Sequence, residues 1–345
     1  MSELLEKLEE THSLSIEEYK ALIEDRTPES RMEAQRKADR ARRRYYGNDV
    51  YIRGLIEITS FCRNDCLYCG LRRSNGRAER YKLSKEEILS CCEEGHALGF
   101  RTFVLQGGEG VFTTGETEEL AREIKRRFPD SALTLSLGEM EREDYQRLFD
   151  AGADRYLLRH ESADREHYKR LHPSSMSLEN RLRCLRDLKE IGYQAGAGFM
   201  VGSPFQTSLC LAEDLKYIEV SSPDMCGIGP FIPASGTPFS SFPPGSADLT
   251  VYLLSLIRLI KPNILLPATT ALGTIEEGGR ERGIKAGANV VMPNLSPFAQ
   301  RRKYSIYDNK LSGGAEAAEN LQLLEKSLSS IGYRMVTSRG DIKTI

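Results

Sequence analysis

The feature that most constrains the fold of this chain is an alternation, from Val50 onward, of short apolar runs with longer amphipathic segments. Helical patterns such as 84–99 and 177–192 separate the runs, and both end on glycine. Strands that alternate with helices indicate a parallel sheet, and eight strands close a (β/α)8 barrel. We therefore predict an α/β protein with a complete TIM-type barrel, with a doubly wound open sheet as the alternative. The eight predicted strands are 53–60, 102–106, 132–136, 155–159, 195–201, 225–231, 263–269 and 288–292.

Both ends of the chain have helical patterns outside the barrel. In residues 1–48, Ser15 begins a capping-box pattern and Thr27-Pro28 opens a further helix with a basic run, which we interpret as a solvated helix face. From Ala315 the pattern predicts one long helix ending at Gly332, followed by a polar edge element. We predict an N-terminal helical extension (1–48), the barrel (49–312) and a C-terminal helix with a tail (313–345).

Composition argues against several classes of partner. The chain has 345 residues, with 48 Lys and Arg against 50 Asp and Glu, so its net charge is −2. Such a balance provides no global field for nucleic acid or an anionic membrane. The longest apolar segment, 251–260, has ten residues and contains Arg258, which is too short for a membrane span. The N-terminus has no apolar leader region. We expect a cytoplasmic protein, by default a monomer.

Three cysteines form a compact array in 61-FCRNDCLYCG-70. Cys62, Cys66 and Cys69 have the spacing C-x3-C-x2-C, with Tyr68 before the third cysteine. In the reducing cytoplasm such an array indicates a metal site more than a disulfide. A structural zinc ion takes four ligands, and the five histidines form no matching pattern. A four-iron cluster held by three thiolates would leave one iron open. We interpret the other five cysteines as small buried hydrophobes.

Polar and glycine-rich residues follow the predicted strands. In barrels of this kind the active site lies where the strands run into their following loops. The sequence therefore predicts a single site at one rim of the barrel. The residues at the strand ends include Gln106-Gly107-Gly108-Glu109, Ser136-Leu137-Gly138-Glu139, Arg159-His160-Glu161, Met200-Val201-Gly202 and Thr269-Thr270.

The array, with an aromatic residue before its last cysteine and a position after the first strand of a (β/α)8 pattern, resembles that of the radical S-adenosylmethionine (SAM) superfamily. The resemblance implies a [4Fe-4S] cluster on Cys62, Cys66 and Cys69 that binds SAM. An external one-electron donor then allows SAM to be cleaved to a 5′-deoxyadenosyl radical. Gly107, Gly108 and Glu109 resemble the GGE element that holds the SAM amino group, and Arg181 resembles the arginine that pairs its carboxylate. The remaining implied cofactor residues are Tyr68, Ser136, Glu161 and Met200.

Longer segments resemble the HydE family of [FeFe]-hydrogenase maturases, over about residues 51–307. They include LYCGLRRSN, LSLGE, AGADRYLLRHE, ENRLRCL, PATTALGT and GANVVMPN. The resemblance implies that the radical attacks the cysteine sulfur of an Fe(CO)2(CN)–cysteine complex, with transient contacts to the maturases HydG and HydF. Arg155 and Arg159, inward on the fourth strand by alternation, are the implied reaction and substrate residues, unless they pair with buried acids. The other implied substrate residues are Thr134, Thr269, Thr270, Tyr304 and Tyr307.

Some members of that family carry a second cluster motif near the C-terminal end of the barrel, and this chain departs from them. No cysteine follows Cys226 here, so we predict a single cluster. Two alternatives stay open. One is another radical SAM enzyme of the biotin synthase and methylornithine synthase subgroup, and the other is a non-catalytic iron–sulfur carrier. A carrier would not need the GGE element or Arg181.

Overall fold

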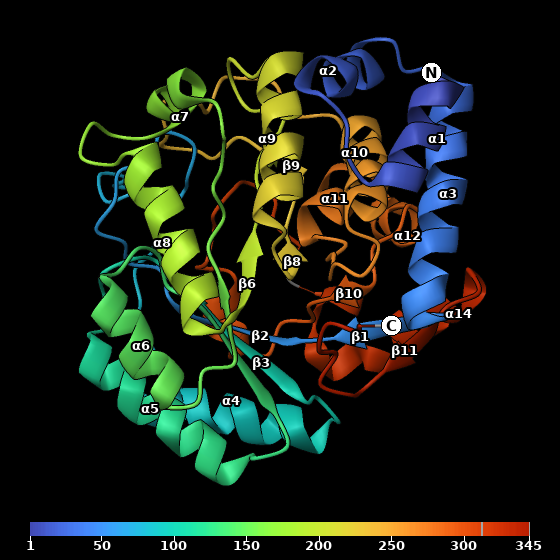
Figure 1. The fold of residues 1–345 in the computed structure, drawn as a ribbon. Coiled ribbons are helices and arrows are strands. Elements are labelled where there is room, and N and C mark those ends of the chain that lie inside the picture. The colour runs from blue at the N-terminus through green and yellow to red at the C-terminus, as the bar shows by residue number, and fades with distance from the viewer. Residues whose placement is uncertain (312, 345) are drawn as a thin grey trace.

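The computed structural model describes residues 1–311 and 313–344, and its centre is a parallel sheet (Figure 1). Each strand of this sheet lies within or next to an apolar run of the sequence, and the residues facing the helices are buried. Six strands pair in the order β2-β3-β4-β5-β6-β8. They are β2 (Gly54–Thr59), β3 (Thr102–Gly107), β4 (Ala132–Ser136), β5 (Arg155–Leu157), β6 (Gln194–Ala197) and β8 (Met225–Cys226).

The sheet closes on itself, so the predicted barrel is confirmed and the open sheet is excluded. The run 263–269 bridges β8 on one side and β10 (Val290–Val291) on the other, and β10 pairs with β1 (Asp49–Ile52), which leads into β2. The closing bridges are Met225 to Leu265, Pro267 to Val290, and Leu55 to Asn294, all parallel. Two short strands, β7 (Met200–Val201) and β9 (Gly229–Pro230), pair beyond the ends of β6 and β8.

Helices surround the strands and bury their apolar faces against them (Figure 1). Ser84 and Thr113 begin two of these helices with complete capping boxes, which satisfy amide groups that the first turn leaves free. The surrounding helices are α4 (Lys85–Ala97), α5 (Thr114–Arg127), α6 (Arg142–Asp150), α7 (Arg165–Leu171), α8 (Leu178–Ile191), α9 (Ser208–Ser221), α10 (Ala247–Ile260), α11 (Thr270–Ile275), α12 (Gly279–Lys285) and α13 (Phe298–Arg301).

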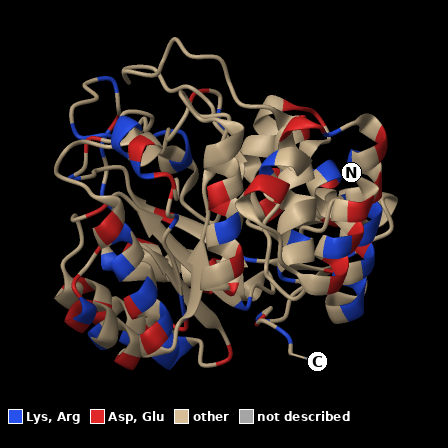
Figure 2. Ribbon diagram, turned by 45° about the horizontal axis from the view of Figure 1, so that its top comes forward, with Lys and Arg blue, Asp and Glu red and all other residues tan. Residues whose placement is uncertain are grey.

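Three N-terminal helices, α1 (Ser2–Thr11), α2 (Ile16–Glu24) and α3 (Pro28–Tyr46), lie along one side of the barrel, where α2 packs on α9 and α3 on α10. Our interpretation of the basic run in α3 as a solvated face is partly wrong. Arg42 is fully buried, with its guanidinium 4.4 Å from the centre of the Tyr333 ring. Elsewhere acidic and basic side chains are interspersed (Figure 2).

The long helix predicted from Ala315 is also wrong. Two 3-10 turns (Gly314–Glu316 and Ala318–Asn320) precede α14 (Leu321–Ser330). The reason is a competing interaction: the backbone of Asn294 donates to Glu316 and accepts from Ala318, which ties the segment to the barrel edge. After α14, β11 (Arg334–Val336) pairs with β1, as expected for an edge element.

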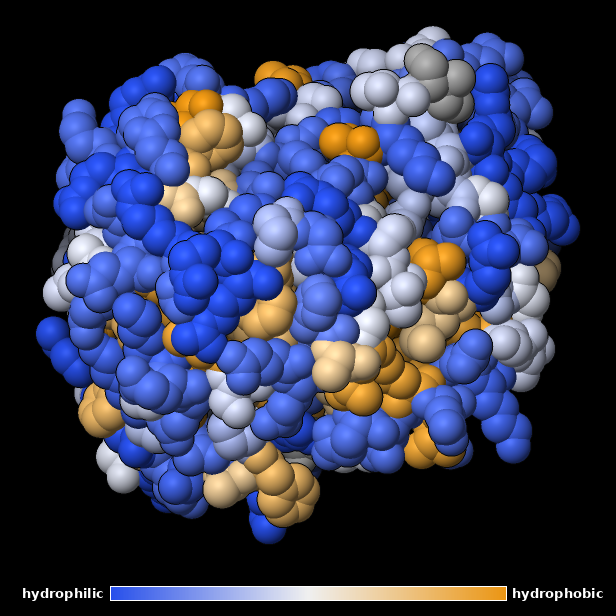
Figure 3. Space-filling view, turned by 90° about the horizontal axis from the view of Figure 1, so that it is seen from below, coloured by the Kyte–Doolittle hydropathy of each residue, from blue (hydrophilic) through white to orange (hydrophobic). Residues whose placement is uncertain are grey.

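The surface has little continuous apolar area on the face seen from below, where orange side chains form separate patches in a largely hydrophilic surround (Figure 3). Among the described residues, no helix is both long enough and apolar enough to span a bilayer.

Candidate active site

The three cysteines of the array lie in one loop that directly follows β2, at the rim where the strands end. The Glu109 amide donates to Cys62 Sγ at 3.3 Å, and Cys66 Sγ lies 3.8 Å from Met176 Sδ. Backbone bonds fix the loop from outside, from Leu67 to Leu171 and from Gly70 to Ile306. All three thiols are unbridged and half-buried. The loop therefore presents three sulfurs from a defined backbone.

Burial raises the pKa of Cys62 and Cys66, and it raises the pKa of Cys69 to about 12. The negative charges of neighbouring thiolates add to this effect at Cys66 and Cys69. Without a cation the three groups therefore stay protonated, and a bound metal would have to displace their protons. If all three thiols lost their protons, their negative charges would repel one another, and a cationic iron centre would offset that repulsion.

The donor set fits an iron–sulfur cluster better than a single metal ion. Among the described residues, no three His, Cys, Asp or Glu side chains converge on one ion position. A cluster does not require convergence, because each thiolate binds a different iron atom. Three sulfurs with an amide hydrogen bond to one of them match a cluster that keeps one iron open.

Gly107 and Gly108 bring β3 against the cysteine loop. A Cβ atom at Gly108 would lie 1.9 Å from the Phe61 carbonyl oxygen and 2.7 Å from Cys62 Cβ. The adjacent Glu109 carbonyl accepts from the Arg63 amide at 2.8 Å. Only glycine at position 108 permits this approach. The predicted GGE element thus lies directly beside the cysteine loop.

Glu109 is buried and pairs with Arg63, whose Nη2 lies 2.7 Å from Glu109 Oε1. Its carboxylate occupies space left by Gly138, which has a φ of +88°; a Cβ there would lie 2.1 Å from Glu109 Oε2. Arg63 also donates to the Glu139 carbonyl at 3.2 Å. Our site prediction omitted Arg63, Gly138 and Glu139, although the motif LSLGE at the end of β4 contains the last two.

Arg181, on the first turn of α8, points into the same rim. Its Nε lies 2.7 Å from Glu139 Oε1, and its Nη1 donates to the Arg159 carbonyl at 3.1 Å. Arg159 in turn pairs with Glu161 at 3.1 Å. Glu161 has a φ of +66°, a strained conformation for a residue with a side chain, and its amide donates a hydrogen bond to the Gly198 carbonyl at 3.0 Å. The structure therefore brings Arg181, Arg159 and Glu161 together.

Tyr68 is enclosed between the loop and the barrel. Its hydroxyl lies 3.4 Å from His172 Nε2, and its ring packs in a cluster that includes Met200 and Phe231. Burial lowers the pKa of His172 to about 3, with the nearby Arg181 charge adding to the shift. His172 is therefore neutral, and it supports the tyrosine that precedes Cys69. Ser136 ends β4, half-buried.

The residues predicted to bind substrate are spread along the lumen. Thr134 has a buried hydroxyl without a hydrogen-bond partner among the described residues. Tyr304 is buried and accepts from Gln106 Nε2 at 3.3 Å, and Tyr307 is half-buried. Thr269 Oγ1 lies 3.4 Å from the Ile228 carbonyl, and Thr270 donates to Glu316 at 2.9 Å. The hydroxyl of Thr270 is thus engaged by the protein itself.

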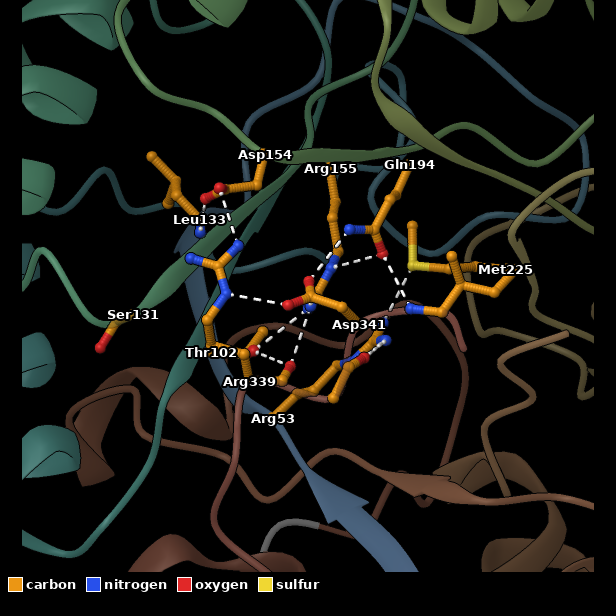
Figure 4. Close-up of polar contacts among 12 residues, drawn as sticks. Arg53, Thr102, Ser131, Leu133, Asp154, Arg155, Gln194, Met225, Arg339 and Asp341 are labelled. Carbon is orange, nitrogen blue, oxygen red and sulfur yellow. Dashed lines mark hydrogen bonds and ion pairs between the residues drawn. The ribbon is translucent and has the colours of Figure 1, made fainter. Parts of the chain in front are cut away.

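The structure does not place Arg155 with Arg159. Arg155 begins β5 and is fully buried at the opposite end of the barrel, where its Nη2 lies 2.5 Å from Asp341 Oδ1 (Figure 4). It also donates to Thr102, Gln194 and the Arg339 carbonyl. The prediction that both arginines meet in one site is wrong for Arg155, because Arg155 lies at the start of β5 and Arg159 lies four positions later, beyond the end of that strand. The buried ion pair, the alternative interpretation, is the one observed.

A cavity of about 250 Å³ opens beside the barrel rim that carries the cysteine loop. Its lining combines both signs of charge with apolar side chains. Arg63, Glu139 and Asn180 connect it to the Glu109 and Arg181 pairs described above. The rim is therefore reachable from outside next to its charged residues.

Comparisons with known proteins show what this chain is similar to. Residues 56–218 match the family model of the radical SAM superfamily. The [FeFe] hydrogenase maturase subunit HydE of Thermotoga maritima is 46% identical over 275 residues, which is 79% of this chain and 78% of that protein. The 3-methylornithine synthase of Methanosarcina acetivorans is 28% identical over 96% of this chain and 91% of its own. The crystal structure of methylornithine synthase (PylB) superposes with a TM-score of 0.85 at 25% identity, covering 96% of this chain and 97% of that one.

Proposed function

Because this chain belongs to the HydE family of radical SAM hydrogenase maturases, we propose that it acts on an Fe(CO)2(CN)–cysteine complex. In the proposed reaction one electron breaks the sulfonium C–S bond of SAM, methionine leaves, and the 5′ carbon forms a bond to the cysteine sulfur while the remaining unpaired electron passes to the iron of the complex, on the route to the diiron unit of the hydrogenase. The observation that best supports a SAM-cleaving site is the meeting of three half-buried thiols with Gly107–Glu109 and Arg181 at one rim.

Cys62, Cys66 and Cys69 would hold the [4Fe-4S] cluster, which supplies one electron to SAM and so generates the 5′-deoxyadenosyl radical. The Gly107–Gly108 backbone and the Glu109 carboxylate would bind the SAM ammonium, since charge-assisted bonds suit that group. Arg181 would pair the SAM carboxylate. Ser136, Glu161, Tyr68 and Met200 would enclose the ribose and adenine and exclude water from the radical.

The substrate would lie below SAM in the lumen. Arg159 would face the anionic ligands, since its Nε and Nη2 atoms are buried and its one carboxylate partner is Glu161 among the described residues. Thr134, Thr269, Tyr304 and Tyr307 would offer hydroxyl groups around it, and Thr270, whose hydroxyl donates to Glu316, would offer only its oxygen as an acceptor.

We further propose one cluster per chain, an external one-electron donor, and transient contacts with the maturases HydG and HydF. A cytoplasmic location fits eight free thiols, which a reducing compartment preserves. A monomer is the simplest assembly.

The test is product formation from the organometallic substrate. The chain is reconstituted with iron and sulfide without oxygen, reduced, and mixed with SAM and a synthetic Fe(CO)2(CN)–cysteine complex. Mass spectrometry is expected to find an adenosylated cysteine product. If SAM is cleaved but the complex is recovered unchanged, the substrate proposal is rejected in favour of another enzyme of the methylornithine synthase subgroup. Uncleaved SAM with four irons bound would favour the carrier.

A further inference from the structure

Segment 337–343, which follows β11, closes the end of the barrel opposite the cysteine loop (Figure 4). Thr102 and Arg155 donate to the Arg339 carbonyl at 2.8 and 2.9 Å. Asp341 accepts from Arg155 at 2.5 Å and from Gln194 at 2.9 Å. These contacts join barrel side chains to the segment, in contrast to the backbone pairing that holds β11. Ile342 also packs on a buried cluster that includes Tyr46 and Tyr51. The segment is therefore attached by side-chain contacts, most of them polar or ionic towards the barrel strands, and not by strand pairing.

Arg53, between β1 and β2, is the most poorly paired charge at this end. It is 5% exposed, and its Nε is buried without a hydrogen-bond partner. Its Nη1 contacts Met225 Sδ at 2.9 Å, and its Nη2 lies 3.5 Å from the Gly340 carbonyl. A thioether is a weak acceptor. Within 1–311 and 313–344 no carboxylate forms an ion pair with Arg53. A buried guanidinium in such surroundings lacks an anion.

Asp341 is shared between the cations of this end. It pairs with Arg155 and, at 3.0 Å, with Arg339. Burial lowers the pKa of Arg53 and the Arg155 charge lowers it further, while Asp341 raises it. Arg339 also lies 3.0 Å from Asp154 Oδ1, and Lys125 lies 3.1 Å from Oδ2 of the same carboxylate, so two cations share that one negative charge. This end of the barrel therefore has more positive than negative charge. The Asp341 side chain is 40% exposed, so it can be reached from solvent.

We propose that segment 337–343 is a displaceable plug in a second opening of the barrel. Arg53 and Arg155 form an anion site behind it. Asp341 occupies this site when the plug is in place, and the carboxylate of a small molecule, or a halide, occupies it when the plug is displaced. Neither the plug nor the anion site depends on the proposed function.

Hydrogen–deuterium exchange tests the plug. D341N keeps the shape of the side chain but removes its charge, and the amides of 338–343 are expected to exchange roughly tenfold faster. D341E should restore slow exchange. The matched control is E325Q on α14, an exposed glutamate with the same loss of charge. If D341N does not fold, the wild-type chain is measured in rising sodium bromide, where faster exchange is expected in 338–343 and not in β3. Unchanged exchange in the segment overturns the plug.

Bromide also tests the anion site directly. Crystals of D341N soaked in sodium bromide are expected to show an anomalous peak within hydrogen-bond distance of Arg53 Nε, and crystals of E325Q are not. Absence of the peak in D341N overturns the anion site. Neither measurement uses SAM, iron or the organometallic complex, so failure here is distinguishable from failure of the proposed function.

Discussion

Arg181 and Glu139 form a buried ion pair at the rim of the barrel, with Arg181 Nε 2.7 Å from Glu139 Oε1 and side chains 8% and 10% exposed. Asn180 adds a hydrogen bond to the other carboxylate oxygen at 2.6 Å. Glu139 thus balances the charge of the arginine that we propose for the SAM carboxylate, although neither Arg181 Nε nor Glu139 Oε1 has a hydrogen-bond partner among the described residues. An anionic ligand would share Arg181 with Glu139 rather than fill an empty position.

E139Q tests this relationship. Leaving Arg181 buried without its carboxylate should cost about 3–5 kcal/mol of folding stability. SAM should then raise the melting temperature of E139Q more than that of the wild type, because it supplies the missing carboxylate. The control is E141Q, whose side chain is 78% exposed and 3.6 Å from Arg183. Equal SAM-induced shifts in E139Q and the wild type would contradict the role of Arg181.

G108A should disable the cysteine loop without altering any ligand. The added methyl group would overlap the Phe61 carbonyl and Cys62 Cβ, so the loop must move. We expect less than half of the wild-type iron after reconstitution and loss of SAM cleavage, with the circular dichroism spectrum unchanged. G115A is the control, because nothing lies within 4 Å of its new Cβ atom. Full iron loading of G108A would show that the close approach is unnecessary.

K310M should weaken the segment that contains Tyr304 and Tyr307. Lys310 pairs with Glu57, which is fully buried on β2, and its ammonium lies 5.0 Å from the centre of the Tyr304 ring. Removing the lysine leaves a buried carboxylate with only Asn294 as a side-chain partner within the described parts of the chain. We expect a loss of about 3–5 kcal/mol in urea unfolding. K303M removes a half-buried lysine of the same loop, and a similar loss there would count against this account.

His172 should make the fold sensitive to mild acid. Its pKa is lowered to about 3 from 6.5, mainly by burial, so the folded chain keeps it neutral while the unfolded chain protonates it as pH falls below 6.5. Stability is therefore full above pH 6.5 and is lost towards pH 3, by about 1.4 kcal/mol per pH unit. Between pH 7 and pH 5 the loss is about 2 kcal/mol.

H172F keeps the stacking on Tyr168, whose ring centre lies 4.0 Å away, and removes the titration. Urea unfolding at pH 7 and pH 5 should therefore show a smaller pH effect in H172F, by about 2 kcal/mol. His167, whose pKa burial also lowers, titrates in both proteins and cancels in the difference. Identical pH effects would mean that the fold does not lower the pKa of His172.

Local pattern was enough to predict the barrel and the cysteine loop, because strand period and cysteine spacing are short-range properties. The Arg155–Asp341 pair was not predictable in this way. Its partners are 186 positions apart, and alternation shows that Arg155 points inward but not which end of the lumen it reaches. Glu139 was visible at a strand end, yet only the structure shows Arg181 of α8 folding back onto it. The start of α14 depended on hydrogen bonds to Asn294, another long-range contact.

The Cys62–Cys69 loop, Gly107–Glu109 and Arg181 are proposed to build a SAM-cleaving site. The most direct measurement is 5′-deoxyadenosine released after anaerobic reconstitution and reduction with SAM present, for the wild type and for C62A, C66A and C69A. We predict about four irons per chain and 5′-deoxyadenosine from the wild type, and none from the three variants. A wild type that binds four irons and releases no 5′-deoxyadenosine, or a variant that still cleaves SAM, would contradict the account.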